Sequence, residues 1–353
     1  MTVTTLPVTV GVEALEDFTR RAFSVAGMPP EDAAVMADKL VGAHLRGFDT
    51  HGVNCIPNYV ANLREGRVAA WPDIRLERRT PWAWAVDGGN GMGHVVADRA
   101  MTAVIGSVRE IGIGIASVRQ STHFGAACLY PLMAAEQGFI GLTLANMAAH
   151  VAPWGSREQL FGTNPLAIAV PAGESPPFVL DMATSAAARR KFRLALELGE
   201  PIPEGWALDA DGKATTDPAA AMAGVALPMG GAKGSGLGMM VEILAGVLSG
   251  AHFAGEVLDM YTNHDRPADS GNFLLALDPA VFMPAGDFGR RMDDLIGRLK
   301  ALETAPGFDE VRFPGERGAR LAEERRRDGI PLTAATAEEL RKLAGEMNLA
   351  FPA

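Results

Sequence analysis

The spacing of apolar positions changes along the chain, and each change predicts a different kind of element. Between Leu15 and Phe23 apolar side chains recur every three or four residues until Gly27, which predicts an amphipathic helix. A second helix is predicted from Pro29-Pro30 to Arg46, because prolines and acidic residues favour the first turn of a helix. The chain therefore begins with two helices.

After residue 71 the pattern changes to short continuous apolar runs separated by turns, which is typical of buried strands. Strands are predicted at Ile111–Val118, Ile140–Ala145, Leu166–Val170, Phe178–Leu180 and Phe273–Leu277. Helices are predicted at His94–Glu110 and Ala126–Gln137, and a further one from the basic cluster at Arg189. This order indicates a central sheet.

The last part of the chain returns to helical spacing. Helices are predicted at Arg290–Leu302 and through the charged segment Gly318–Arg327, and Thr336 with Glu339 forms the pattern of a capping box for a last helix. We expect this tail, residues 290–353, to wrap the central residues 71–289 together with residues 1–70. No internal repeat interrupts this organisation.

A glycine loop, LPMGGAKGSGL, leads directly into a helix that is apolar on nearly all sides. Such a pattern predicts a buried helix. Lys233 and several glycine amides at its N-terminus predict an anion site, although Ala232 before the lysine breaks the P-loop pattern.

Composition and charge limit the classes of function. The chain has 353 residues, 48% hydrophobic and 21% charged, so we expect a soluble globular protein with a sizeable core. The net charge of -10 disfavours nucleic acid and anionic membranes as partners, and an anionic substrate would need a local positive site. Two cysteines, no N-terminal signal pattern and no apolar run of membrane-spanning length predict a cytoplasmic location.

Two histidines lie in turns, where side chains are both fixed and reachable. His123 follows an apolar run and precedes Gly125, and His51 lies just beyond a helix end beside Gly52 and Asn54. An imidazole in such a place can exchange protons near neutral pH. The alternative for each is a structural histidine with satisfied hydrogen bonds.

Two other segments have the composition of phosphate-binding loops. Gly89, Gly91 and Gly93 precede a helix, but the spacing is G-x-G-x-G and no acidic residue follows at the distance a Rossmann site requires, so a structural turn is predicted. The segment after Phe178 combines DMATS with Arg189, Arg190 and Lys191, which could hold a phosphate or diphosphate or form a solvated basic face.

Eight segments, taken in order, resemble motifs of the non-Rossmann malate/L-lactate dehydrogenase family. They are RGFDTHGVNCIPNY, DGGNGMGH, STHFGAA, GTNPLAIAVP, LDMATS, IPEGWALD, LPMGGAKGSGL and FPGER. This family includes sulfolactate and ureidoglycolate dehydrogenases, diketogulonate reductase and a reductase of cyclic imino acids. The resemblance covers nearly the whole chain.

The resemblance implies an oxidoreductase that uses NAD or NADP and acts on a small 2-hydroxy or 2-keto acid or a cyclic imino acid. It also implies an α/β (α+β) fold with a large mixed sheet in place of the doubly wound one, and a homodimer. Residues 71–289 would then bind the cofactor, and the helical wrapper would contribute to substrate binding and dimerisation.

Particular residues carry over from the same motifs. His51 and His123 are implied as the acid/base groups, and no metal ligands are implied. Cofactor contacts are implied at Asn146, Asp181, Met182, Ala183, Thr184, Lys233, Gly315, Glu316 and Arg317. Substrate contacts are expected at Arg46, Asn54 and Thr163.

The chain departs from the family pattern at Cys55, where relatives usually carry an arginine able to clasp a carboxylate. Asn272 and Ser235 are further departures, at positions that are often histidine and aromatic. Cys55 favours a second hypothesis, a catalytically silent relative that binds ligand without turnover. Retention of His51, His123, Asp181 and Lys233 together argues for the enzyme.

Overall fold

The computed structural model describes residues 8–260, 262 and 266–352. At its centre lies a seven-stranded sheet in which β3 and β4 run parallel and the other neighbouring pairs run antiparallel. This confirms the expected α/β fold with a large mixed sheet. In spatial order the strands are β2 (Arg75–Thr80), β3 (Ala83–Asp87), β4 (Ile113–Ser121), β11 (Ser270–Leu277), β5 (Ile140–Ala145), β6 (Leu166–Val170) and β7 (Phe178–Met182).

Helix α4 (Gly93–Ile111) connects the parallel pair β3 and β4 and packs on one face of the sheet with α5 (Leu129–Ala135). The glycine turn before α4 has its amides bound within the protein: Gly91 N–H donates to the Gly88 carbonyl, and Gly93 N–H donates to Thr122 Oγ1 at 2.9 Å. A Cβ at Gly93 would lie 2.2 Å from the Thr122 carbonyl oxygen. The predicted structural turn is confirmed, because these amides are already used.

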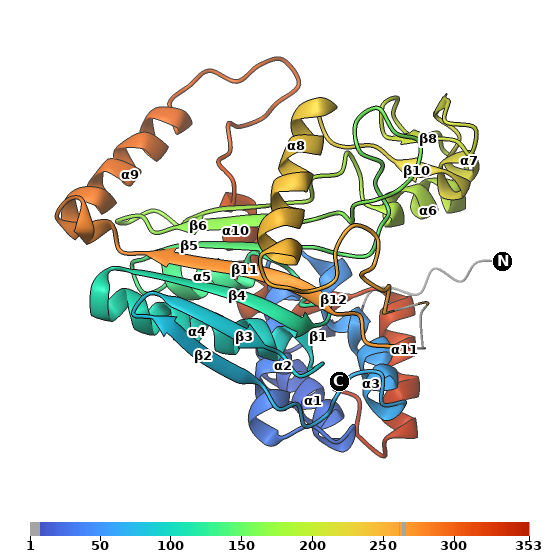
Figure 1. Cartoon of the computed structure of the whole chain (residues 1–353), viewed down its shortest axis with the longest axis horizontal. Coiled ribbons are helices and arrows are strands. Elements are labelled where there is room, and N and C mark those ends of the chain that lie inside the picture. The colour runs from blue at the N-terminus through green and yellow to red at the C-terminus, as the bar shows by residue number, and fades with distance from the viewer. Residues whose placement is uncertain (1–7, 261, 263–265, 353) are drawn as a thin grey trace.

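The first and last parts of the chain share one hydrophobic core, which contains Phe18, Leu40, Tyr59 and Leu340. Figure 1 shows the blue N-terminal and red C-terminal segments side by side. The elements are β1 (Val8–Val10), α1 (Val12–Val25), α2 (Pro30–Leu45), α3 (Ile56–Arg64), α10 (Glu316–Asp328), β12 (Ile330–Leu332) and α11 (Ala334–Glu346).

The expected capping box of α11 was misplaced by three residues. Thr333 is the N-cap, and its hydroxyl accepts the Thr336 N–H at 3.2 Å. Thr336 therefore lies inside the first turn. Either threonine has a hydroxyl that can cap a helix. Thr333 is the N-cap because β12 ends at Leu332, directly before it.

Helix α9 (Ala285–Lys300) begins earlier than predicted and lies away from α1, α2 and α11 (Figure 1), while its last residue, Lys300, pairs with Glu316 at the start of α10. Asp293 anchors it to the loop between β6 and β7 by accepting the N–H groups of Glu174 and Ser175. A small three-stranded sheet lies at the opposite end of the molecule (Figure 1). It comprises β8 (Ala207–Leu208), β9 (Ala214–Thr215) and β10 (Val225–Ala226), with α6 (Arg189–Leu198) and α7 (Pro218–Ala223) beside it.

The prediction that the glycine-rich helix is buried was wrong. Helix α8 (Ala232–Val241) continues into a π-helix, η3 (Glu242–Val247), and only one side faces the sheet. Gly238, Val241 and Glu242 are buried, whereas the opposite side exposes Met239 (55%), Ile243 (47%), Val247 (52%) and Leu248 (59%). Lys233, in the first turn, is also exposed. Among the described residues, none of the helices has the length and apolar content needed to cross a bilayer.

Candidate active site

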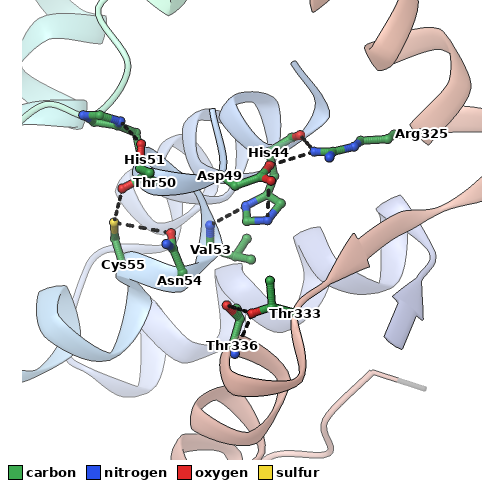
Figure 2. A network of polar contacts seen from close by, with 10 residues as sticks. All are labelled: His44, Asp49, Thr50, His51, Val53, Asn54, Cys55, Arg325, Thr333 and Thr336. Carbon is green, nitrogen blue, oxygen red and sulfur yellow. Dashed lines mark hydrogen bonds and ion pairs between the residues drawn. The ribbon is translucent and has the colours of Figure 1, made fainter. Parts of the chain in front are cut away.

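His51 lies on a tight double turn between α2 and α3. The turn consists of two short 3₁₀ helices, η1 (Asp49–His51) and η2 (Val53–Cys55), joined at Gly52. A Cβ at Gly52 would lie 2.1 Å from His44 Nδ1, so a larger residue does not fit. The Thr50 hydroxyl lies 2.8 Å from His51 Nδ1 (Figure 2) and orients the ring.

His123 lies just beyond the end of β4, and the fold brings it against His51. The two rings stack with centroids 5.6 Å apart and planes inclined by 18°. The Tyr59 hydroxyl, from α3, lies 2.6 Å from His123 Nδ1. Both imidazoles are partly exposed, so the two residues predicted to carry the chemistry form one accessible pair.

Two neighbours of this pair, Tyr59 and His94, were not predicted as site residues. Tyr59 is fully buried, and His94, also fully buried, lies 5.1 Å from the Tyr59 ring and 6.3 Å from His123 between centroids. Neither ring nitrogen of His94 has a hydrogen-bond partner among the described residues. Both residues stand in quoted motifs, GVNCIPNY and DGGNGMGH, which is the signal that could have marked them.

The surroundings keep the imidazoles neutral. Burial, and then the charge of His51, lowers the pKa of His123 to about 3. Burial, and then the charge of Arg190, also lowers the pKa of His51. Both imidazoles are therefore neutral near pH 7, the form in which an imidazole can accept a proton.

Of the predicted substrate residues, Asn54 lies beside the histidine pair, whereas Arg46 lines a separate cavity. Asn54 is beside the site, where its Oδ1 lies 3.6 Å from the thiol of Cys55. That thiol is buried and also donates to the Thr50 carbonyl at 3.3 Å. The Arg46 guanidinium lies 3.7 Å from Glu136 and lines a cavity of about 660 Å³ to which neither site histidine contributes.

One predicted cofactor residue, Asn146, binds the buried carboxyl group of Glu242. Asn146 Nδ2 donates to it at 3.3 Å and to the His252 carbonyl at 2.7 Å, while Asn146 Oδ1 accepts the Gly271 N–H. Asn164 Nδ2 donates to Glu242 at 2.6 Å. The Asn146 amide is thus fully used inside the protein.

The partly exposed Thr163 is joined to the end of β7 in the same region. Its carbonyl accepts both the N–H and the hydroxyl of Thr184, at 2.9 and 3.2 Å. Met182 ends β7 and Ala183 follows it. The structure therefore links Thr163 with the 182–184 segment.

Asp181 lies on the edge strand β7, and the 315–317 turn packs against the same strand. The Asp181 carboxylate accepts the Cys128 N–H at 3.0 Å, and burial raises the pKa of Asp181. Gly315 packs so closely on β7 that a Cβ there would lie 2.7 Å from the Val179 nitrogen. Glu316 pairs with Lys300 at 2.8 Å, and Arg317 is exposed.

The N-terminus of α8 has the chemistry of an anion site. Gly231 precedes it with a positive φ of 67°, and no side chain caps its first amides. Lys233 lies in the first turn with its side chain exposed. Uncapped amides, the helix dipole and a lysine together suit a phosphate group.

Comparison with known proteins gives a consistent result. The model of the family described as malate/L-lactate dehydrogenase matches residues 10–341. The chain is 38% identical to L-sulfolactate dehydrogenase of Methanocaldococcus jannaschii over 323 residues, 92% of each chain, and 37% identical to malate dehydrogenase of Pyrococcus abyssi over 340 residues, 94% of this chain and 93% of the other. The solved structure of the Methanocaldococcus jannaschii sulfolactate dehydrogenase has a TM-score of 0.91 and 36% identity, covering 97% of this chain and 98% of that one.

Proposed function

This chain belongs to the malate/L-lactate dehydrogenase family, and on that premise we propose that it is an NAD- or NADP-dependent dehydrogenase. Its substrate is a small 2-hydroxy or 2-keto acid or a related cyclic imino acid. The observation that carries the proposal is the stacked, partly exposed pair His51 and His123, held by Thr50 and Tyr59.

The proton chemistry follows from the geometry of this pair. When bound, nicotinamide accepts or supplies the hydride. Because Thr50 occupies Nδ1 of His51, we assign proton exchange with the substrate hydroxyl to Nε2 of that ring, or to the His123 ring beside it. Their lowered pKa values leave both imidazoles free to take the hydroxyl proton during oxidation. In reduction the same group returns the proton.

The cofactor would lie along the edge formed by α8 and β7. Lys233 and the uncapped amides of α8 suit the diphosphate, and the 181–184 segment and the 315–317 turn would hold the rest of the dinucleotide. Asn146 would contribute indirectly, because its side chain joins η3, the continuation of α8, to the His252 carbonyl and to β11.

A cation is required for the substrate carboxylate, and Cys55 cannot supply it. Arg190 is exposed at the start of α6 and its charge, after burial, lowers the pKa of His51, while Arg46 lies against Glu136. We therefore assign the substrate carboxylate to Arg190. Arg190→Gln should raise KM for anionic substrates with kcat less affected, and Arg193→Gln, on the same exposed helix, is the matched control.

The test of the function is a panel of 2-hydroxy acids, 2-keto acids and cyclic imines, assayed with NAD(H) and NADP(H) by absorbance of the reduced nicotinamide. Turnover of at least one substrate class is expected. Cofactor binding without any turnover would instead favour the catalytically silent relative. No cofactor binding by calorimetry would overturn the proposal.

We also propose a homodimer that uses the exposed apolar side of α8 and η3. Four large apolar side chains, Met239, Ile243, Val247 and Leu248, stand on consecutive turns there. Such a stripe in a chain with net charge -10 is unusual for a surface that faces only water, so a second copy is the occupant we assign to it.

A further inference from the structure

Arg325 connects the C-terminal part of the chain to the turn that presents His51. From α10 its Nη1 donates to Asp49 Oδ1 at 2.8 Å and to the His44 carbonyl oxygen (Figure 2). Asp49 and Arg325 are 276 positions apart in sequence. The arginine side chain is only 11% exposed, whereas Asp49 is 51% exposed, so the guanidinium reaches the turn from within the protein.

The turn itself has few backbone bonds to hold it. His51 N–H donates to the Phe48 carbonyl, Gly52 N–H to Asp49, and Cys55 N–H to Gly52. Such short 3₁₀ segments have poorer hydrogen-bond geometry than an α-helix. Side-chain contacts must therefore fix the direction in which the His51 ring points.

One such contact comes from inside the protein. Buried His44 accepts the Val53 N–H on Nδ1 at 3.1 Å, which places its own proton on Nε2, 3.7 Å from Asp49. Burial lowers the pKa of His44 to about 4, so the acceptor state persists at neutral pH. His44 from α2 and Arg325 from α10 both reach Asp49, the first residue of the turn.

We propose that Arg325 is a positioning residue for His51, because it holds Asp49 and the end of α2 so that the imidazole stays stacked on His123. The inference rests on the proposed function, in which this pair exchanges protons with the substrate. Displacing a reacting group by about 1 Å can cost a hundredfold in rate. The hydrogen bonds of Arg325 to the described residues go to Asp49 and to the His44 carbonyl oxygen.

The test compares Arg325→Met and Arg325→Lys with Arg327→Met. Arg327 is the matched control, because it lies on the same helix, is 73% exposed and pairs only with its neighbour Asp328 among the described residues. We expect Arg325→Met to lower kcat roughly tenfold to hundredfold while cofactor affinity stays within about threefold. Millimolar guanidinium, or the lysine variant, should restore part of kcat.

Asp49→Ala gives a second, independent variant, because it removes the acceptor for Arg325 at a side chain that is half exposed. It should lower kcat in the same direction, and in the double variant Arg325→Met should add only the part that comes from its bond to the His44 carbonyl oxygen. Unchanged kcat in folded Arg325→Met would overturn the positioning role. The positioning role would also be overturned if kcat of Arg325→Met fell only in proportion to the amount of folded protein and neither guanidinium nor the lysine variant restored it. A wild-type enzyme without turnover would overturn the proposed function itself, before any variant is compared.

Discussion

The His51 and His123 rings lie next to each other, and this limits how many protons the pair can carry. Their ring centroids are 5.6 Å apart, and the charge of one lowers the pKa of the other. Two like charges at this distance, partly removed from water, repel each other. The pair therefore takes up one proton at a time, which suits a reaction that transfers one proton with one hydride.

His51→Ala and His123→Ala should each lower kcat on the order of a hundred- to ten-thousand-fold, the usual contribution of general acid/base assistance. Cofactor affinity should change little, because neither ring lies on the α8–β7 edge. Steady-state kinetics and calorimetric titration of the cofactor measure the two effects. Near-normal kcat in both variants would refute the assignment.

Placing a cation at Cys55 tests how the substrate carboxylate is bound. Cys55→Arg should improve activity on malate, lactate and pyruvate-type substrates and impair the native substrate, because a bidentate guanidinium-carboxylate contact contributes about 1.5 to 3 kcal/mol, roughly ten- to hundredfold in binding. It should also rescue part of the KM defect of Arg190→Gln. Kinetics of the two single variants and the double variant decide this.

Cys55→Ser, which keeps the size of the side chain, is the control. If folded Cys55→Arg still binds cofactor but gains nothing on any substrate, in either background, then Cys55 is a neutral replacement. The substrate carboxylate would then lie out of reach of this position.

The site histidines could be predicted from local sequence, and their partners could not. His51 and His123 stand beside glycines in turns, a signal contained within a few residues. Tyr59 and His94 lie on helices whose pattern indicates only that they are buried. Arg325 belongs to a charged segment that resembles any solvated helix surface, because sequence spacing does not show which distant segment it meets.

The α8–η3 element shows where periodicity misleads. A helix that is apolar on all sides is expected to be buried, and the prediction placed it inside the fold of a single chain. The sheet covers only the side that carries Val241 and Glu242. Apolar spacing does not distinguish a partner within the chain from a second molecule.

Glu242, at the start of η3, should be the most sensitive polar position of this element. It is buried and accepts hydrogen bonds from Asn146, Asn164 and the Ala254 N–H. Glu242→Ala would leave these donors unpaired at about 1 to 3 kcal/mol each, so the free energy of unfolding should fall by roughly 3 kcal/mol or more. Urea denaturation measures it, with exposed Glu339→Ala as the control. A loss below about 1 kcal/mol would show that water replaces the carboxyl group.

Across the complete chain, the order of the elements was predictable from their patterns, whereas the strand order was not. Apolar runs mark strands but carry no pairing information, and the mixed sheet was expected only from the resemblance to the family. The sheet inserts β11, which is distant in sequence, between β4 and β5. Likewise, the shared core of α1–α3 with α10 and α11 depends on contacts between the two ends of the chain.

The exposed side of α8 and η3 gives the last prediction, which concerns the association of two chains. If a second copy covers it, Ile243→Asp should convert a dimer into a monomer, because a carboxylate in an apolar interface loses its hydration without gaining a partner. Sedimentation velocity would measure the change. Leu295→Asp, at an exposed apolar position on α9, is the control and should remain dimeric. A wild-type monomer at micromolar concentration, or an Ile243→Asp variant that sediments as the wild type does, would show that this surface has another occupant.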